Sequence, residues 1–354
     1  MIQPLTSLRF FFAFMVFASH YKIGGTPIFE DGYIGVSFFF MLSGFILSYS
    51  YRNRLLEKKT SKTDFYIARF ARIYPLHLIM LLSYVVLLFM SNAVNWSLLP
   101  LNLLLLQSFI PHEAIYFSFN AVSWSISDEM FFYLLFPFII IFINKLKPRG
   151  KLLFISSILV LYTILTFVIP NSLTHSLFYI SPIFRITDFI IGMMVFVLWE
   201  HSKTKYATNQ TKATKTTLEM VALVVLGLFI YYAPLIDQIY KFGIYYWLPM
   251  SVIIFIFAQK ENMGGYISDL LSMRWLVFLG EISFGFYMIH LFTLKIVDLT
   301  IKKIGLSDMP ILLHFSITLI SILVLSALSF LLFETPCNKY IKSKYRLYKN
   351  KYHE

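Results

Sequence analysis

Charged residues and cysteine are scarce in this sequence. Of its 354 residues only 14% are charged, while 58% are hydrophobic and 19% are aromatic. Soluble domains carry about 25% charged residues. The single cysteine, Cys337, excludes an internal disulfide, a cysteine-based zinc site and an iron–sulfur cluster built by one chain. The composition therefore excludes a soluble domain and indicates a chain that lies mostly within a membrane.

Several widespread catalytic motifs are also absent. The sequence contains no G-x-S-x-G nucleophile elbow, H-E-x-x-H zinc motif, Walker A loop or G-x-G-x-x-G fingerprint. Their absence removes the common hydrolase, metalloprotease and nucleotide-fold interpretations, and we expect no metal site. The first residues carry no basic segment, and the apolar run after them contains Arg9 and no small-residue cleavage site, so we expect a retained helix rather than a signal peptide.

Long apolar runs are what the sequence has in abundance. Ten of them approach the length of about 20 residues that a membrane-spanning helix needs. The runs are 5–21, 33–50, 73–90, 123–144, 152–169, 183–199, 218–234, 242–258, 276–294 and 311–333. They predict an all-α polytopic membrane protein with about ten transmembrane helices. Residues 1–333 would form a single membrane domain, and residues 334–354 a basic cytoplasmic tail.

The charges of the connecting segments indicate the orientation. The formal net charge is +12, which in a soluble protein would suggest a nucleic-acid partner. Here 23 of the 30 lysines and arginines fall in alternate connections, as expected when basic loops stay in the cytoplasm. We therefore expect both termini in the cytoplasm, a lipid bilayer as the surrounding partner and no nucleic acid. No feature specifies an oligomeric state.

An eleventh apolar run, residues 98–110, does not fit this alternation. It has 13 residues, too few to cross a bilayer as a helix, and counting it would place the basic segment 145–151 outside. We expect a short re-entrant or surface segment on the outer side, where irregular backbone can be buried in protein.

Span one carries two ionisable residues, Arg9 and His20. Eleven residues separate them, so on a helix they share one face and lie roughly 16 Å apart along the axis. Ionisable groups inside a membrane are costly and usually have a functional or pairing role. Taken alone, a histidine near the end of a span is more often an interfacial or core residue than a catalyst. The presence of Arg9 on the same helix face modestly favours a catalytic role for His20.

Other polar residues fall in the outer half of the predicted bilayer and suggest one polar cavity there. By depth this group comprises His20, Glu129, Arg185, Asp188 and His290. Arg185 and Asp188 are three residues apart and can pair on one helix face, where a helix-positioning ion pair is the favoured interpretation.

Two arginines lie on the cytoplasmic side, just before span three. Arg69 and Arg72 are three residues apart, so their guanidinium groups could bind phosphates together. Plain positive-inside anchoring predicts the same residues, and the spacing leaves both interpretations open.

Seven motifs spread over nearly the whole chain, in order, are similar to those of one family. They are TSLRFFFAFMVFASH (6–20), GYIGVSFFFMLSGFIL (32–47), FYIARFARIYP (65–75), WSISDEMFFYLLFP (124–137), FRITDFIIGM (184–193), LGEISFGFYMIH (279–290) and FETP (333–336). Together they resemble the bacterial acyltransferase-3 family of integral membrane acyltransferases. The chain departs from the usual pattern at Ser37, where Asp is frequent, and at Phe292, where Pro is frequent. It ends about 20 residues after span ten, so we expect no C-terminal esterase-like domain of the kind some members carry.

The resemblance implies transfer of an acyl group, often acetyl from cytoplasmic acetyl-CoA, to a hydroxyl of an envelope polysaccharide or lipid-linked glycan. Acyl-CoA would be a donor substrate and not a permanently bound cofactor, and the location would be a bacterial inner (cytoplasmic) membrane. The expected residue roles are as follows: His20 as general base, Arg9 as donor-binding or charge-stabilising group, Glu129 as orienter of the histidine, Arg69 and Arg72 as docking groups for the donor phosphates, and Ser125, Arg185, Asp188 and His290 as support.

Two alternatives stay open at this stage. A covalent acyl-histidine relay would use the same residues as direct transfer. A secondary transporter or flippase would also place arginine, histidine and acidic residues inside the membrane, although we find no internal repeat of spans that would favour it.

Overall fold

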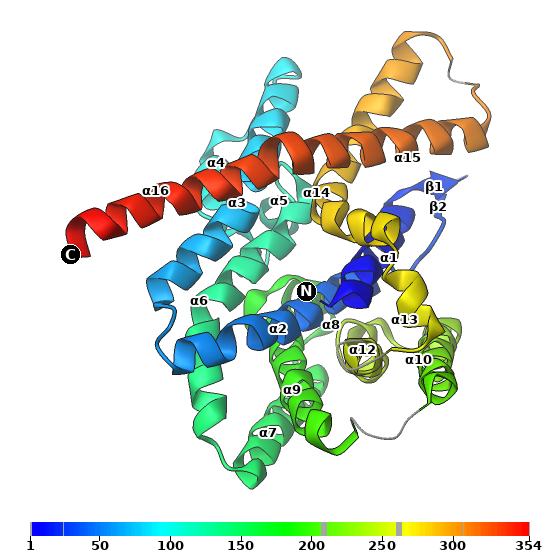
Figure 1. The fold of residues 1–354 in the computed structure, drawn as a ribbon. Coiled ribbons are helices and arrows are strands. Elements are labelled where there is room, and N and C mark those ends of the chain that lie inside the picture. The colour runs from blue at the N-terminus through cyan, green and yellow to red at the C-terminus, as the bar shows by residue number, and fades with distance from the viewer. Residues whose placement is uncertain (1, 24, 207–210, 260–263, 307, 354) are drawn as a thin grey trace.

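The computed structural model describes residues 2–23, 25–206, 211–259, 264–306 and 308–353, and within these ranges the chain is almost entirely helical (Figure 1). The long helices are α1 (Gln3–His20), α2 (Tyr33–Leu56), α3 (Lys62–Met90), α6 (Trp124–Lys145), α7 (Pro148–Val168), α9 (Pro182–Tyr206), α10 (Lys212–Tyr232), α12 (Ile244–Ala258), α14 (Arg274–Lys303), α15 (Ile311–Leu328) and α16 (Thr335–His353). Short helices are α4 (Leu99–Leu103), α5 (Glu113–Tyr116), α8 (Asn171–Thr174), α11 (Gln238–Lys241) and α13 (Tyr266–Leu271). The strands β1 (Lys22–Ile23) and β2 (Thr26–Pro27) pair antiparallel.

Nine helices in the described ranges are long and apolar enough to cross a membrane. All ten predicted runs fall on long helices. The remaining run, 5–21, lies on α1, which is not among the nine helices. This helix has only 18 residues, and two of them, Arg9 and His20, are ionisable. The prediction of an all-α polytopic membrane protein is confirmed.

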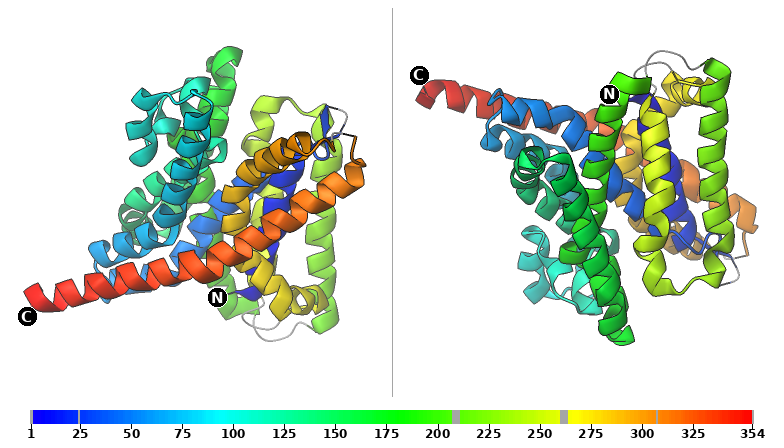
Figure 2. Two further views of the ribbon diagram at one scale, coloured as in Figure 1. Left: turned by 90° about the horizontal axis from the view of Figure 1, so that it is seen from above. Right: turned by 90° about the horizontal axis from the view of Figure 1, so that it is seen from below.

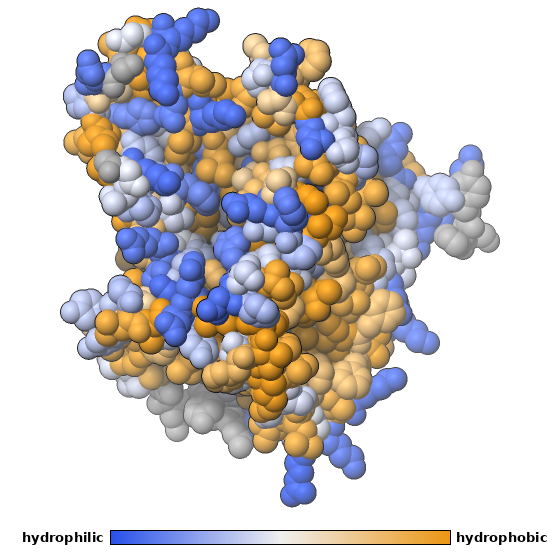
Figure 3. All heavy atoms as spheres, turned by 180° about the vertical axis from the view of Figure 1, so that it is seen from behind, coloured by the Kyte–Doolittle hydropathy of each residue, from blue (hydrophilic) through white to orange (hydrophobic). Residues whose placement is uncertain are grey.

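Large apolar side chains cover the outer surface, as expected for contact with lipid. On α7 the side chain of Phe167 is 74% exposed, and on α15 that of Leu312 is 74% exposed. Figure 3 shows apolar residues over much of one face. An exposed apolar surface of this extent would be unfavourable in water, and contact with the hydrocarbon chains of lipids removes it from water.

Two helix pairs approach each other closely through glycine. A Cβ on Gly192 of α9 would lie 1.8 Å from the carbonyl oxygen of Met41 on α2, and one on Gly280 of α14 would lie 1.9 Å from that of Thr6 on α1. Small residues allow membrane helices to pack backbone to backbone. The α1–α14 contact fixes the two helices that carry Arg9, His20 and His290.

The segment between α3 and α6 does not cross the membrane. It folds into 3₁₀ turns at Trp96–Leu98, Gln107–Phe109 and Ala121–Ser123, together with α4 and α5. Its buried polar groups pack against the start of α6: Ser127 donates a hydrogen bond to the Leu105 carbonyl (2.5 Å) and Ser108 donates one to Ser127 (2.6 Å). The prediction of a non-spanning segment near 98–110 is confirmed.

Both chain ends lie toward one end of the helical bundle, opposite β1 and β2, in the two views of Figure 2. The prediction that this end is cytoplasmic concerns the orientation in the membrane and stays a prediction. A π-helical turn, Ser329–Glu334, joins α15 to α16, so the basic stretch expected as a tail is a helix that continues the last span.

Candidate active site

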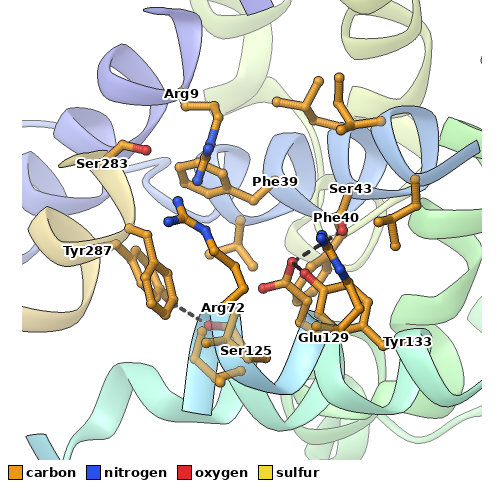
Figure 4. A pocket seen from close by; sticks show the side chains of 18 residues that line it. Arg9, Phe39, Phe40, Ser43, Arg72, Ser125, Glu129, Tyr133, Ser283 and Tyr287 are labelled. Atoms are coloured by element: carbon orange, nitrogen blue, oxygen red, sulfur yellow. Dashed lines mark hydrogen bonds between the residues drawn. The ribbon is translucent and has the colours of Figure 1, made fainter. Parts of the chain in front are cut away.

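A cavity of about 160 Å³ lies where α1, α2, α3, α6 and α14 meet (Figure 4). Its polar lining residues are Arg9, Ser43, Arg69, Arg72, Ser125, Glu129, Tyr133, Ser283 and Tyr287. Arg9, Arg69, Arg72, Glu129 and Ser125 were all predicted as site residues, and the structure brings them together. The remaining walls are apolar, so charged groups here interact in a medium of low dielectric constant.

Three guanidinium groups dominate the charge of this cavity. Figure 4 shows the heads of Arg9 and Arg72 pointing toward one another. Arg69 donates a hydrogen bond to the Tyr51 hydroxyl (3.2 Å), and its guanidinium lies 5.8 Å from the centre of the Tyr133 ring. Its buried Nε has no partner among the described atoms. Like charges held this close favour an anion between them.

Helix α3 begins before the apolar run that starts at residue 73. It begins at Lys62, so Arg69 and Arg72 lie about 10 and 15 Å along its axis, within the helix rather than at its first turn. Both side chains line the cavity, and their expected role in docking the donor phosphates stays a prediction.

Glu129 is anchored inside the same cavity. Its Oε1 accepts hydrogen bonds from Ser43 (3.2 Å) and from the Tyr133 hydroxyl, and it lies within electrostatic range of Arg9. The expectation that it orients His20 is wrong, because the ring of His20 contacts other groups. The segment between α3 and α6 packs against the start of α6, and Glu129, one turn further along, faces the cavity that Arg9, Arg69 and Arg72 line.

Ser125 and Tyr287 form a hydroxyl pair in the wall of the cavity. Their oxygens are 2.8 Å apart, and Tyr287 also donates to the Val122 carbonyl (3.2 Å). These bonds tie α6 to α14 beside the three arginines. Ser125 thus lies in the cavity wall, and its supporting role stays a prediction.

A second carboxylate, Glu334, was not assigned a role from the sequence. It is 4% exposed, accepts a hydrogen bond from Ser329 (3.1 Å), and lies within electrostatic range of Arg72 and Arg9. Its Oε2 has no partner among the described atoms. The FETP motif contains Glu334 and could have indicated a role for it. We assigned this glutamate to the polar tail because it follows the last apolar run.

His20 lies at the other end of α1, beside His290 of α14. Nδ1 of His20 is 2.9 Å from the Val16 carbonyl and 3.2 Å from Nε2 of His290, while Nδ1 of His290 is 2.6 Å from the Tyr287 carbonyl. Carbonyl oxygens only accept hydrogen bonds, so both Nδ1 atoms carry the proton. Nε2 of His290 therefore accepts from His20, and Nε2 of His20 keeps a free lone pair.

A second cleft, of about 420 Å³, opens beside His20. We refer to it as the outer cleft because the predicted orientation places it outside. The Tyr21 hydroxyl is 2.7 Å from Nδ1 of His314, and Nε2 of His314 is 2.9 Å from Asp298. Because the carboxylate accepts from Nε2, the His314 Nδ1 accepts the Tyr21 proton, giving a carboxylate–imidazole–hydroxyl chain. Sequence reasoning missed His314 and Asp298, since they lie on different helices and show no spacing signal.

Arg185 and Asp188 belong to neither cavity. They form the predicted pair on α9 at 2.9 Å, each about 1% exposed, and Arg185 also donates to Ser37 (3.0 Å) and to the Phe242 carbonyl. The Trp247 indole donates to Asp188. The pair thus connects α9 with α2 and α12, and the single outer cavity expected from depth is divided into separate sites.

One helix face links the cavity to His20. On α14, Ser283 and Tyr287 line the cavity, and His290 follows Tyr287 by one turn. On α1, Arg9 lines the cavity, and His20 lies on the same face about three turns further along the helix. No group of three His, Cys, Asp or Glu side chains that could hold a metal ion is present in the described ranges.

The profile described as an acyltransferase domain (acyltransferase-3) matches residues 4–331. The acyltransferase MdmB of Streptomyces mycarofaciens is 29% identical over 325 residues, which cover 83% of this chain and 79% of that protein. No solved structure matched significantly.

Two longer relatives carry more specific names. One is the "Putative peptidoglycan O-acetyltransferase YrhL" of Bacillus subtilis (strain 168), which is 25% identical over 95% of this chain and 54% of its own length. The other is the "Putative O-acetyltransferase SACOL0978" of Staphylococcus aureus (strain COL), at 24% identity over 87% and 53%. The chain thus spans about half the length of these two relatives.

Proposed function

The chain belongs to the acyltransferase-3 family of integral membrane acyltransferases, and on that premise we propose that it transfers an acetyl group from acetyl-CoA to a hydroxyl of a cell-envelope polysaccharide or lipid-linked saccharide. The names of the relatives support acetyl as the transferred group and, for YrhL, a glycan as the acceptor. In this proposal the protein lies in the cytoplasmic (inner) membrane with both termini in the cytoplasm, as the distribution of basic residues indicates.

The observation that carries the proposal is the placement of two different chemistries on one face of α1 and α14. At one end Arg9 joins Arg69 and Arg72 in a cavity suited to an anion. At the other end His20 presents a free Nε2 next to the outer cleft. A reaction between a cytoplasmic anionic donor and an outer hydroxyl acceptor needs this separation.

The donor enters from the side of Arg69 and Arg72, whose guanidinium groups attract its phosphates. Its thioester arm follows the face of Ser283 and Tyr287 toward His290. Arg9 lies along this route and stabilises negative charge on the donor. Glu129 and Glu334 limit the mutual repulsion of the arginines.

His20 acts as the general base on the acceptor. Its Nε2 takes the hydroxyl proton while the acceptor oxygen attacks the thioester carbonyl and forms a tetrahedral oxyanion. Collapse of this intermediate breaks the carbon–sulfur bond, and the proton on His20 passes to the departing CoA thiolate. The imidazolium formed in between donates a stronger, charge-assisted hydrogen bond through Nδ1 to Val16 and His290.

The acyl-histidine route uses the same nitrogen. In that route Nε2 of His20 attacks the thioester first, and the acceptor hydroxyl then removes the acyl group. Both routes require the Nδ1–H tautomer that Val16 and His290 favour.

The outer cleft is the proposed acceptor site. Lys22, Asp298 and His314 line it together with His20, and such groups hydrogen-bond to the hydroxyls of a saccharide. The chain from Asp298 through His314 to Tyr21 would orient these groups beside the base.

The proposal is tested with protein reconstituted in vesicles, carboxyl-labelled acetyl-CoA outside and an envelope saccharide extract as acceptor. We expect release of one CoA thiol for each base-labile acetyl ester formed, with neither product made by His20→Ala. Label that accumulates inside the vesicles without ester formation would contradict the proposal and favour transport.

A further inference from the structure

The basic helix α16 is fixed against the helix that carries Arg69 and Arg72. Lys349 of α16 bonds to both carboxylate oxygens of Asp64 on α3, at 3.0 and 2.9 Å. Asp64 also closes a capping box with Ser61 at the start of α3, so its position is set by the helix itself. The ion pair therefore anchors α16 at a defined point.

Four cationic side chains lie near this ion pair: Arg69 and Arg72 on α3, and Lys342 and Arg346 on α16. Along α3, Arg69 and Arg72 follow Asp64 by about 7.5 and 12 Å; along α16, Lys342 precedes Lys349 by about 10 Å. The helices pack against each other, and Lys342 lies within electrostatic range of Arg69, Arg72 and Arg346.

Lys342 and Arg346 lack acidic partners. In the part of the chain that the structure describes, neither forms an ion pair, whereas Lys349 uses Asp64. They are four residues apart and thus share one helix face, an arrangement of like charges that destabilises an isolated helix. With Arg69 and Arg72 they form a cationic cluster, which an anion would stabilise.

The cavity is too small for a whole acyl-CoA. Its volume of about 160 Å³ is below the 300 to 1,000 Å³ typical of sites for drug-sized ligands, which are themselves smaller than CoA. The cavity can take the thioester end of the donor, and the nucleotide end then lies outside it. Arg69 and Arg72 line the cavity and lie within electrostatic range of Lys342 on α16, so the cationic cluster borders the cavity.

We infer that α16 completes the donor site: Lys342 and Arg346 bind the phosphates of the adenosine 3′,5′-bisphosphate end of acyl-CoA, opposite Arg69 and Arg72. This inference rests on the proposed function, because it names where the nucleotide of that donor binds. The basic helix is then part of the substrate site as well as a marker of membrane orientation. The phosphate of an anionic lipid has similar chemistry, and the experiment separates the two sources.

The test is equilibrium binding to the full chain in nanodiscs of phosphatidylcholine alone. The probes are acetyl-CoA, 3′-phospho-ADP, which lacks the thioester arm, and S-acetylpantetheine, which lacks the nucleotide. The variant is Lys342→Ala with Arg346→Ala. The control is Lys344→Ala with Lys351→Ala, which removes the same charge from positions about 180 to 200° around α16 from Lys342.

The test variant should weaken binding of acetyl-CoA and of 3′-phospho-ADP by about tenfold or more, the loss of a charge-assisted phosphate contact. Binding of S-acetylpantetheine and every affinity of the control should change less than about twofold. Equal weakening of all three probes, or of none, would overturn the inference while leaving the proposed donor intact. The same measurements are repeated in nanodiscs that also contain phosphatidylglycerol, and an effect of the variant seen only there would overturn the inference and assign the cluster to lipid. Failure of the wild type to bind acetyl-CoA would instead overturn the proposed function.

Discussion

Nε2 of His290 lies 3.2 Å from Nδ1 of His20 and accepts its hydrogen bond. If His20 is the base, as we propose, the carboxylate that usually fixes the tautomer of a catalytic histidine is replaced by a second imidazole. Being neutral, this acceptor leaves His20 without a permanent negative neighbour in the apolar bundle. Its own tautomer is set in turn by the Tyr287 carbonyl.

Replacing His290 tests this relationship. His290→Leu removes the acceptor and should lower kcat by about ten- to a hundredfold, less than loss of the base itself, because the Val16 carbonyl still holds Nδ1. His290→Gln can still accept through its amide oxygen and should recover most of the rate. The donor KM should stay constant in both variants. Equal kcat values for the Leu and Gln variants would show that the hydrogen bond is unimportant.

The paired arginines on α3 should govern donor affinity. Arg69→Ala with Arg72→Ala should raise the KM for acetyl-CoA by at least about tenfold, because two cations that face the donor are lost. Arg54→Ala, an exposed arginine at the end of α2, is the matched control. An unchanged KM in a folded double variant would show that Arg69 and Arg72 do not bind the donor and serve only to orient the protein in the membrane.

The buried pair on α9 should matter for stability. Arg185→Leu leaves the Asp188 carboxylate buried without its cation and should destabilise the protein by about 3 to 5 kcal/mol. Replacing both residues by leucine should recover much of this loss, since no unpaired charge remains. Thermal unfolding in detergent measures the effect. A double variant that is less stable than Arg185→Leu would contradict a simple ion-pair role.

The close contact of α1 with α14 depends on Gly280. Gly280→Ala places a methyl group 1.9 Å from the Thr6 carbonyl, so the helices must separate and both stability and transfer should fall. Gly227→Ala on α10 meets no atom within 4 Å and should be neutral or stabilising by up to about 1 kcal/mol. Circular dichroism melts and acetyl transfer assays of the two variants provide the comparison. Similar behaviour of the two would mean that this contact does not hold the site.

Much of the architecture follows from local features of the sequence. Apolar runs of sufficient length specify the helices, and the segment 98–110 is recognised as too short to span. The i, i+11 relationship of Arg9 and His20 and the i, i+3 pair of Arg185 and Asp188 need only helical geometry, and the structure has both residue pairs on single helices.

Contacts between helices could not be predicted in the same way. The contacts of Glu129 in the cavity depend on how α6 packs against α2, and the pairing of His20 with His290 depends on how closely Gly280 lets α14 approach α1. Asp298 and His314 meet only because α14 and α15 are adjacent. Such relationships arise from packing between segments far apart in the sequence, which no spacing pattern encodes.

The most direct test of the account is mass spectrometry of envelope glycans from a strain that lacks the gene, complemented with wild type, His20→Ala or His112→Ala. His112 is an exposed histidine of the segment between α3 and α6 and serves as the control. We expect a base-labile acetyl increment with wild type and with His112→Ala, and none with a membrane-inserted His20→Ala protein. An undiminished increment with His20→Ala would contradict the assignment of His20 as the base, and with it the central claim.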